Sequence, residues 1–153
     1  MTLLLVRHAD AGDRIAWTGD DRARPLSATG RRQAEALVAA HRAQPLGRVL
    51  CSPARRCIDT VAPLAEARDL PVEEDEALAE GAPFDAVDRL LRSCADRDTL
   101  LCSHGDVVGM VVAELRRHGL VGADARWRMA ATWLLDTWPD TTHVTHLPPP
   151  DVG

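Results

Sequence analysis

The segment Thr99-Leu100-Leu101-Cys102-Ser103-His104-Gly105 carries the clearest structural signal in this chain. It opens with a short apolar run, which is typical of a buried strand. From Gly105 onward a helix is predicted, and it ends where basic residues are followed by a glycine, at Arg116-Arg117-His118-Gly119. A strand that passes directly into a helix is the repeating unit of layered α/β folds.

The same alternation recurs along the rest of the chain. Strands are predicted at residues 3–6, 47–51, 70–72, 132–137 and 142–146. Helices are predicted at 27–43 with Ser27 as N-cap, from Ser52-Pro53 with a kink or break at Pro63, and from Pro83. This order predicts a three-layer α/β/α sandwich with a mainly parallel sheet, in which the last two strands form an antiparallel edge.

Length and charge narrow the class of protein. The chain has 153 residues and a net charge of -5, so we expect one domain over residues 1–153. An acidic chain lacks the broad basic surface of a nucleic-acid binder. No apolar stretch is long enough to span a bilayer or to form a signal sequence, and the four cysteines form no C-x-x-C pair. We therefore expect a cytoplasmic protein with reduced, mostly buried thiols, no membrane partner and no nucleic-acid partner.

Two of the predicted strands end in a histidine, at His8 and at His104. Ligands of open α/β sheets bind beyond the carboxyl ends of the strands. If these two strands are neighbours, the two histidines face each other across one crevice. Arg7 precedes the first histidine, and Arg55-Arg56 begin the helix after another strand. Because a guanidinium group stays charged and matches phosphate oxygens, this set predicts a pocket for a phosphoryl group.

Three short motifs carry a resemblance to a known family. The stretch Leu5–Ala9 resembles the R-H-G or R-H-A motif of the histidine phosphatase superfamily. The stretch Ser52–Thr60 is similar to its second motif, S-P-x-x-R-A/C-x-Q-T, and aligns the phosphate-binding arginine with Arg56. Ser103-His104-Gly105 matches the third motif. The resemblance implies a phosphoglycerate mutase-like fold, and the three motifs in this order make it specific.

The region from Trp17 to Gly30 resembles the small branch that contains the phosphohistidine phosphatase SixA. It looks closer still to the histidine phosphatase domains that follow a Nudix hydrolase domain in some proteins. Two positions depart from the usual pattern, since Ala9 replaces the more common glycine and Asp59 replaces glutamine. The resemblance covers residues 3 to about 149.

The family implies a mechanism that needs no metal and no other cofactor. His8 attacks phosphorus and becomes a phosphohistidine, while Arg7, Arg56 and His104 hold the phosphoryl oxygens. A carboxylate or the bound phosphate is expected to keep His104 protonated. Glu80 falls where many members place the acid that protonates the leaving group, although it also reads as a solvated loop carboxylate.

Several alternatives stay open at this level. The short stretch between Arg56 and His104 leaves little chain for a cap, so an open pocket is expected and a mutase is disfavoured. The substrate is either a phosphorylated small molecule or a phosphohistidine protein. A catalytically weak, phosphate-binding regulatory module is the alternative function, and a metal site at Cys102 and His104 is a weaker one. The sequence leaves the oligomeric state undetermined.

Overall fold

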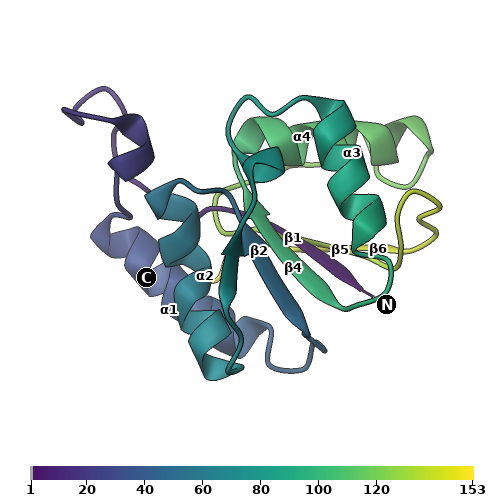
Figure 1. Ribbon diagram of the computed structural model, residues 1–153, viewed down its shortest axis with the longest axis horizontal. Helices are drawn as coiled ribbons and strands as arrows, with labels where there is room; N and C mark the ends of the chain where they lie inside the picture. Colours follow the sequence, from purple (N-terminus) through teal and green to yellow (C-terminus); the bar gives the residue numbers. More distant parts are fainter. Residues whose placement is uncertain (1) are drawn as a thin grey trace.

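A mixed six-stranded sheet forms the centre of the protein, for which a computed structural model describes residues 2–153 (Figure 1). The strands lie in the order β3-β2-β4-β1-β5-β6. Their bounds are β1 Leu3–Arg7, β2 Arg48–Cys51, β3 Val72–Glu74, β4 Thr99–Ser103, β5 Thr132–Leu135 and β6 Val144–Leu147. Strands β1 to β4 run parallel to one another, and β5 and β6 add antiparallel pairs at one side. The predicted mainly parallel sheet with an antiparallel edge is therefore confirmed.

Four helices cover the two faces of this sheet. Helices α1 (Ala28–Ala40) and α2 (Arg55–Ala67) lie together on one face. Helices α3 (Phe84–Ser93) and α4 (Gly105–Arg117) lie on the other, as Figure 1 shows. Two short 3-10 turns, η1 (Asp21–Ala23) and η2 (Glu76–Leu78), sit in the loops. The α/β/α sandwich predicted from the alternation of strands and helices is confirmed.

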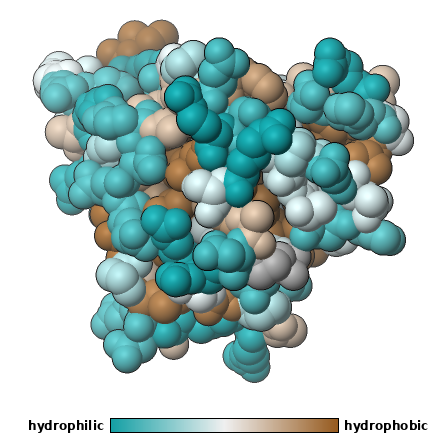
Figure 2. Space-filling view, turned by 45° about the vertical axis from the view of Figure 1, so that its right-hand side comes forward, coloured by the Kyte–Doolittle hydropathy of each residue, from teal (hydrophilic) through white to brown (hydrophobic). Residues whose placement is uncertain are grey.

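Successive residues of β1 belong to opposite cores. Leu3 and Leu5 pack with α3 and α4, whereas Leu4 and Val6 pack with α1 and α2. A central strand that is covered on both faces must be apolar throughout, which explains the continuous run that identified it in the sequence. Burial of these four side chains contributes roughly 1.5–3 kcal/mol each. Polar side chains dominate the visible outer face, with apolar atoms showing between them (Figure 2).

Glycine at position 30 holds the loop after β1 against the first turn of α1. A Cβ built on Gly30 would lie 1.9 Å from the carbonyl oxygen of Asp10, so no other residue fits this approach. Ser27 caps the helix as predicted, because its hydroxyl accepts a 3.0 Å hydrogen bond from the Gly30 amide. The backbone amide of Ser27 also donates to the Asp10 carbonyl at 3.0 Å. These contacts anchor the loop that carries His8.

Three local predictions were wrong. Ala54, not Ser52, is the N-cap of α2, and Pro63 neither ends nor splits that helix. Packing of α2 against the sheet offsets the single hydrogen bond that a proline removes. Strand β3 begins at Val72 rather than Leu70, since Pro71 has no amide to donate to the ladder. Within residues 2–153, no helix combines the length and the apolarity that a membrane crossing requires.

Candidate active site

The two strand-end histidines meet at one edge of the sheet. Strands β1 and β4 are adjacent and parallel, with Arg7 paired to Ser103. The backbone amide of His8 donates to the carbonyl of Ser103 at 2.9 Å, which extends the pairing by one residue. The imidazole rings of His8 and His104 lie 5.4 Å apart, edge to face. The expectation that they face each other is thus confirmed, because the strands are neighbours.

His8 presents a free electron pair at Nε2. Its side chain is buried, and its Nδ1 lies 2.8 Å from the carbonyl oxygen of Ala9. A carbonyl only accepts hydrogen bonds, so Nδ1 carries the hydrogen and Nε2 the lone pair. Burial lowers the pKa of His8 to about 3, and the charges of His104, Arg56 and Arg7 lower it as well. The hydrogen bond to the Ala9 carbonyl raises the pKa but is outweighed. The ring is therefore neutral at pH 7.

Arg56 lies at the first turn of α2 and is fully buried, at 1% exposure. It donates to the Asp21 carbonyl at 2.8 Å and to the Asp21 carboxylate at 3.0 Å, and its Nη2 is 3.4 Å from Nδ1 of His104. Burial raises the pKa of Asp21, but the hydrogen bond from Arg24 and the charges of Arg56 and Arg14 outweigh it and lower the pKa overall. The Nε of Arg56 has no partner in the described chain.

His104 is held from the opposite side by Ser52. Its Nε2 lies 2.8 Å from the Ser52 hydroxyl and 3.6 Å from the sulfur of Cys57. No carboxylate is among its hydrogen-bond partners in residues 2–153, so the carboxylate partner expected from the sequence is not found there. His104 is also the N-cap residue of α4, where backbone amides and the helix dipole favour a bound anion.

Arg7 crosses the start of α4 beside a glycine. A Cβ at Gly105 would lie 2.9 Å from the guanidinium carbon of Arg7, so the glycine after His104 makes room for this side chain. Nη1 of Arg7 donates to the carbonyl of Trp127 at 3.1 Å, whereas its buried Nε has no partner in the described residues. The histidine pair is thus flanked by two guanidinium groups, each with a buried Nε–H that has no hydrogen-bond partner in the described residues.

A cavity of about 450 Å³ opens beside Arg7 and His8, whereas the buried Arg56 and His104 are not among its lining residues. Arg7, His8 and Glu80 are among the residues that line it. Glu80 pairs with Arg14 at 2.6 Å, and its second oxygen is 3.6 Å from Arg56. The structure therefore brings together all five residues that the sequence singled out, from four separate segments of the chain.

Several residues of this cavity were missed in the sequence. Arg24, Asp106 and Trp127 are among the residues that line it, and Arg24 donates to the Ala11 carbonyl at 2.6 Å. Asp21 binds Arg56 but is not among the lining residues. Each of these residues either contacts a partner that is distant in the sequence or lies in a loop that has no regular apolar pattern. The sequence around it therefore contains no signal that assigns it to the site. Asp21 and Arg24 stood in the stretch from Trp17 to Gly30 that resembles the SixA branch, without an assigned role.

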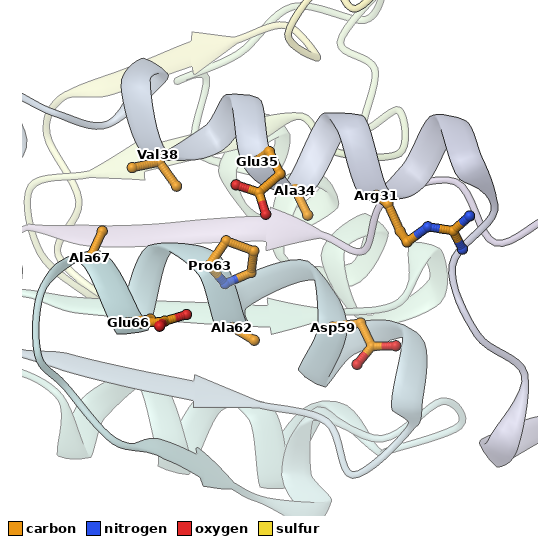
Figure 3. A pocket seen from close by; sticks show the side chains of 9 residues that line it. All are labelled: Arg31, Ala34, Glu35, Val38, Asp59, Ala62, Pro63, Glu66 and Ala67. Atoms are coloured by element: carbon orange, nitrogen blue, oxygen red, sulfur yellow. The ribbon is translucent and has the colours of Figure 1, made fainter.

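A larger cavity, of about 590 Å³, lies elsewhere, between α1 and α2 (Figure 3). Glu35, Asp59 and Glu66 line it among small apolar side chains, with Arg31 at one end (Figure 3). Three carboxylates repel a phosphoryl group. This groove is therefore not the phosphate site, in spite of its size.

Cysteines and metal ligands complete the description of the site. All four cysteines are free and buried, as expected from the sequence. Within residues 2–153, no three His, Cys, Asp or Glu side chains are grouped as ligands for a metal ion. Cys102 and His104 accordingly lack the further ligands that a zinc site requires.

Comparison with known proteins agrees with the family resemblance, and the matched region of the family model contains the first two motifs. The family model of the histidine phosphatase superfamily (branch 1) matches residues 3–82. A protein of Mycolicibacterium smegmatis named 8-oxo-(d)GTP phosphatase is 33% identical over 157 residues, and the match covers 98% of this chain and 49% of that protein. The chain thus spans about half the length of this relative.

Solved structures share the fold at lower sequence identity. The protein histidine phosphatase SixA, in complex with tungstate, superposes with a TM-score of 0.76 at 24% identity, over 96% of this chain and 94% of that chain. A SixA-type structure from Agrobacterium tumefaciens also gives 0.76, at 20% identity over 97% and 98%. A mycobacterial glucosyl-3-phosphoglycerate phosphatase gives 0.69, at 20% identity over 95% and 96%. At these identities the likeness concerns the fold.

Proposed function

Since the chain belongs to the histidine phosphatase superfamily, we propose that it hydrolyses phosphate esters or phosphohistidine through a phosphohistidine formed on His8. The observation that carries the proposal is the arrangement of His8. Its ring is neutral, Nδ1 is held by the Ala9 carbonyl, and Nε2 keeps its lone pair beside His104. A histidine held this way is a nucleophile that needs no separate base.

The first step transfers the phosphoryl group to His8. Nε2 attacks phosphorus, a P–N bond forms, and the P–O bond to the leaving group breaks with its electrons on oxygen. Arg7, Arg56 and His104 hold the three phosphoryl oxygens and stabilise the charge that spreads over them. The unpartnered N–H groups of Arg7 and Arg56 support this role, since an oxyanion would satisfy both.

The second step regenerates the enzyme. Water attacks phosphorus, the P–N bond breaks, and its electrons return to Nε2 of His8 while inorganic phosphate leaves. Positive charge comes from arginine and histidine side chains throughout, so the proposed mechanism is independent of metal ions.

The phosphoryl group is the shared feature of the substrates named for the relatives. Those names include 8-oxo-(d)GTP, protein histidine and glucosyl-3-phosphoglycerate, which have little else in common. We propose a phosphorylated small molecule or a phosphohistidine protein as substrate for this chain. Exposed Arg14 and Glu80, at 56% and 42% side-chain exposure, border the cavity and leave it accessible to either.

Trapping the intermediate tests the proposal. Reaction with ³²P-labelled phenyl phosphate in EDTA, followed by a rapid alkaline quench, should leave label on the protein that is stable to base and labile to acid. Peptide mapping should place the label on His8. Turnover that needs a divalent metal, or label at another residue, contradicts the mechanism. Tight phosphate binding without label or turnover would instead favour the regulatory module that shares this fold.

Glu80 is proposed to protonate the leaving oxygen. Glu80 lies 2.6 Å from Arg14 and 3.6 Å from Arg56, and a bound phosphoryl group would compete with it for Arg56. The proton that Glu80 passes to the leaving oxygen is returned to it by the water that attacks phosphorus in the second step. Glu80→Gln should lower kcat/KM about a hundredfold for an alkyl phosphate and less than about tenfold for phenyl phosphate, because an alkoxide needs the proton more.

A matched control for this comparison is Glu76→Gln. Glu76 is an exposed carboxylate nearby that pairs with Arg22 at 3.0 Å, and its removal should change neither rate. Equal losses for the alkyl and phenyl substrates in Glu80→Gln would remove Glu80 as the acid.

A further inference from the structure

A second cavity, of about 430 Å³, adjoins the one that contains His8. Its charged lining side chains are all arginines: Arg7, Arg116, Arg126 and Arg128. Trp127 forms part of its wall, and no carboxylate is among the side chains of the described chain that line it. Four like charges around one cavity are unusual in a protein whose net charge is -5.

This arginine cavity shares two of its lining residues with the catalytic one. Arg7 and Trp127 line both cavities. The indole of Trp127 lies against α4, where a Cβ on Gly109 would come within 3.0 Å of the ring. Arg116 is 11 residues beyond Gly105 on the same helix, which corresponds to about 16 Å at 1.5 Å per residue. The arginine cavity therefore extends from the phosphoryl site along α4.

The guanidinium groups of this cavity are available to an anion. In residues 2–153, none of Arg116, Arg126 and Arg128 has a carboxylate oxygen within 4.0 Å. Arg116 donates only to the Gly122 carbonyl at 3.3 Å, and Arg126 only to the nearby carbonyls of Asp124 and Ala125. Neutral carbonyls leave the charge of these side chains uncompensated, unlike the paired Arg24 and Arg56.

We propose that the arginine cavity binds a second anionic group on the leaving-group side of a small-molecule substrate. The proposal rests on the proposed function, because His8 defines which end of the substrate reacts. The phosphoryl group would lie over His8, the body of the substrate would pass Trp127, and a distal phosphate or carboxylate would lie between Arg126, Arg128 and Arg116. Guanidinium groups bind either anion in a bidentate manner.

A pair of ligands with the same six-carbon chain isolates the distal charge. Hexanediol bisphosphate carries one phosphate at each end, and hexyl phosphate carries one only. We expect the wild-type chain to prefer the bisphosphate over hexyl phosphate by at least about tenfold, both in Kd and in kcat/KM. The two equivalent ends of the bisphosphate account for only about twofold of this preference. The preference should decline as salt is raised. A hexyl phosphate that ends in a carboxylate distinguishes the two anions.

The double variant Arg126→Gln/Arg128→Gln should reduce the preference to about twofold, largely through KM. The control Arg32→Gln/Arg42→Gln removes the same charge from exposed positions of α1 and the turn after it, and should keep the wild-type ratio. The ratio of kcat/KM for the two ligands is measured on one protein preparation, so a smaller fraction of folded protein affects both values equally and leaves the ratio unchanged. A wild-type preference of twofold or less overturns the proposal, as does an equal loss in both double variants.

Calorimetric Kd values on His8→Asn keep the two proposals apart. In one outcome the wild-type chain hydrolyses neither substrate while the bisphosphate still binds more tightly than hexyl phosphate, and this difference is lost when Arg126 and Arg128 are replaced. In that case the arginine site stands and the proposed catalysis fails. If both are hydrolysed at equal kcat/KM and bound with equal Kd, catalysis stands and the arginine site fails.

Discussion

His8→Asn is expected to lower kcat/KM for phenyl phosphate by about a thousandfold or more, to the level that binding and charge stabilisation alone provide. Asparagine can reproduce the hydrogen bond that Nδ1 gives to the Ala9 carbonyl, now 2.8 Å long, but it offers no lone pair that can attack phosphorus. Steady-state kinetics measured in EDTA report this loss.

Two controls accompany this variant. The melting temperature should stay near that of the wild type, because the new side chain is smaller and keeps the backbone contact. Vanadate should still bind, since Arg7, Arg56 and His104 are unchanged. More than about a tenth of the wild-type activity in His8→Asn would exclude His8 as the nucleophile, whatever the effect on stability.

Arg56→Lys is expected to lower kcat/KM about a hundredfold or more while the protein stays folded. Arg56 reaches the Asp21 carboxylate at 3.0 Å and Nδ1 of His104 at 3.4 Å with one planar group. A lysine ammonium keeps the charge but cannot serve the Asp21 contact and a phosphoryl oxygen with two parallel bonds. The loss should appear in kcat as well as in the Ki of vanadate, because the arginine acts on the transition state.

Arg55→Lys is the matched control for this change. Arg55 is the preceding residue of α2, has a 60% exposed side chain, and pairs with Asp59 at 3.3 Å on the helix surface. Its replacement should alter kcat/KM by less than about twofold, because exposed ion pairs contribute little. A similar loss in both variants would show that α2 as a whole, and not Arg56, is sensitive to substitution.

The sequence alone predicted the order of the strands along the chain and the candidate residues of the site. Central strands of a parallel sheet are buried on both faces, so Leu3–Val6 and Thr99–Cys102 had to be apolar runs and could be recognised as such. A histidine at the end of each run then lay at the edge where ligands bind. His8, Arg7, Arg56 and His104 were found because short motifs tie each of them to the end of a strand.

Local rules failed where a residue has a distant partner. Ser52 carries the signal of an N-cap, yet its hydroxyl lies 2.8 Å from Nε2 of His104 and the cap passes to Ala54. Pro63 should interrupt α2, yet packing keeps that helix continuous. In both cases a contact between remote segments outweighs a local preference of about 1–3 kcal/mol.

The electrostatic surroundings of the site also depend on contacts that no local pattern encodes. Asp21 accepts a hydrogen bond from Arg56, which is 35 positions away in the sequence, and the Trp127 carbonyl accepts one from Arg7, which is 120 positions away. The low pKa of His8 follows from burial and from charges on three different segments. Periodicity and motifs report on neighbours in the chain, and so they point to the proposed nucleophile and the proposed phosphate-binding residues. Which loops enclose them, and where the arginine cavity lies, follows only from the packing of the whole chain.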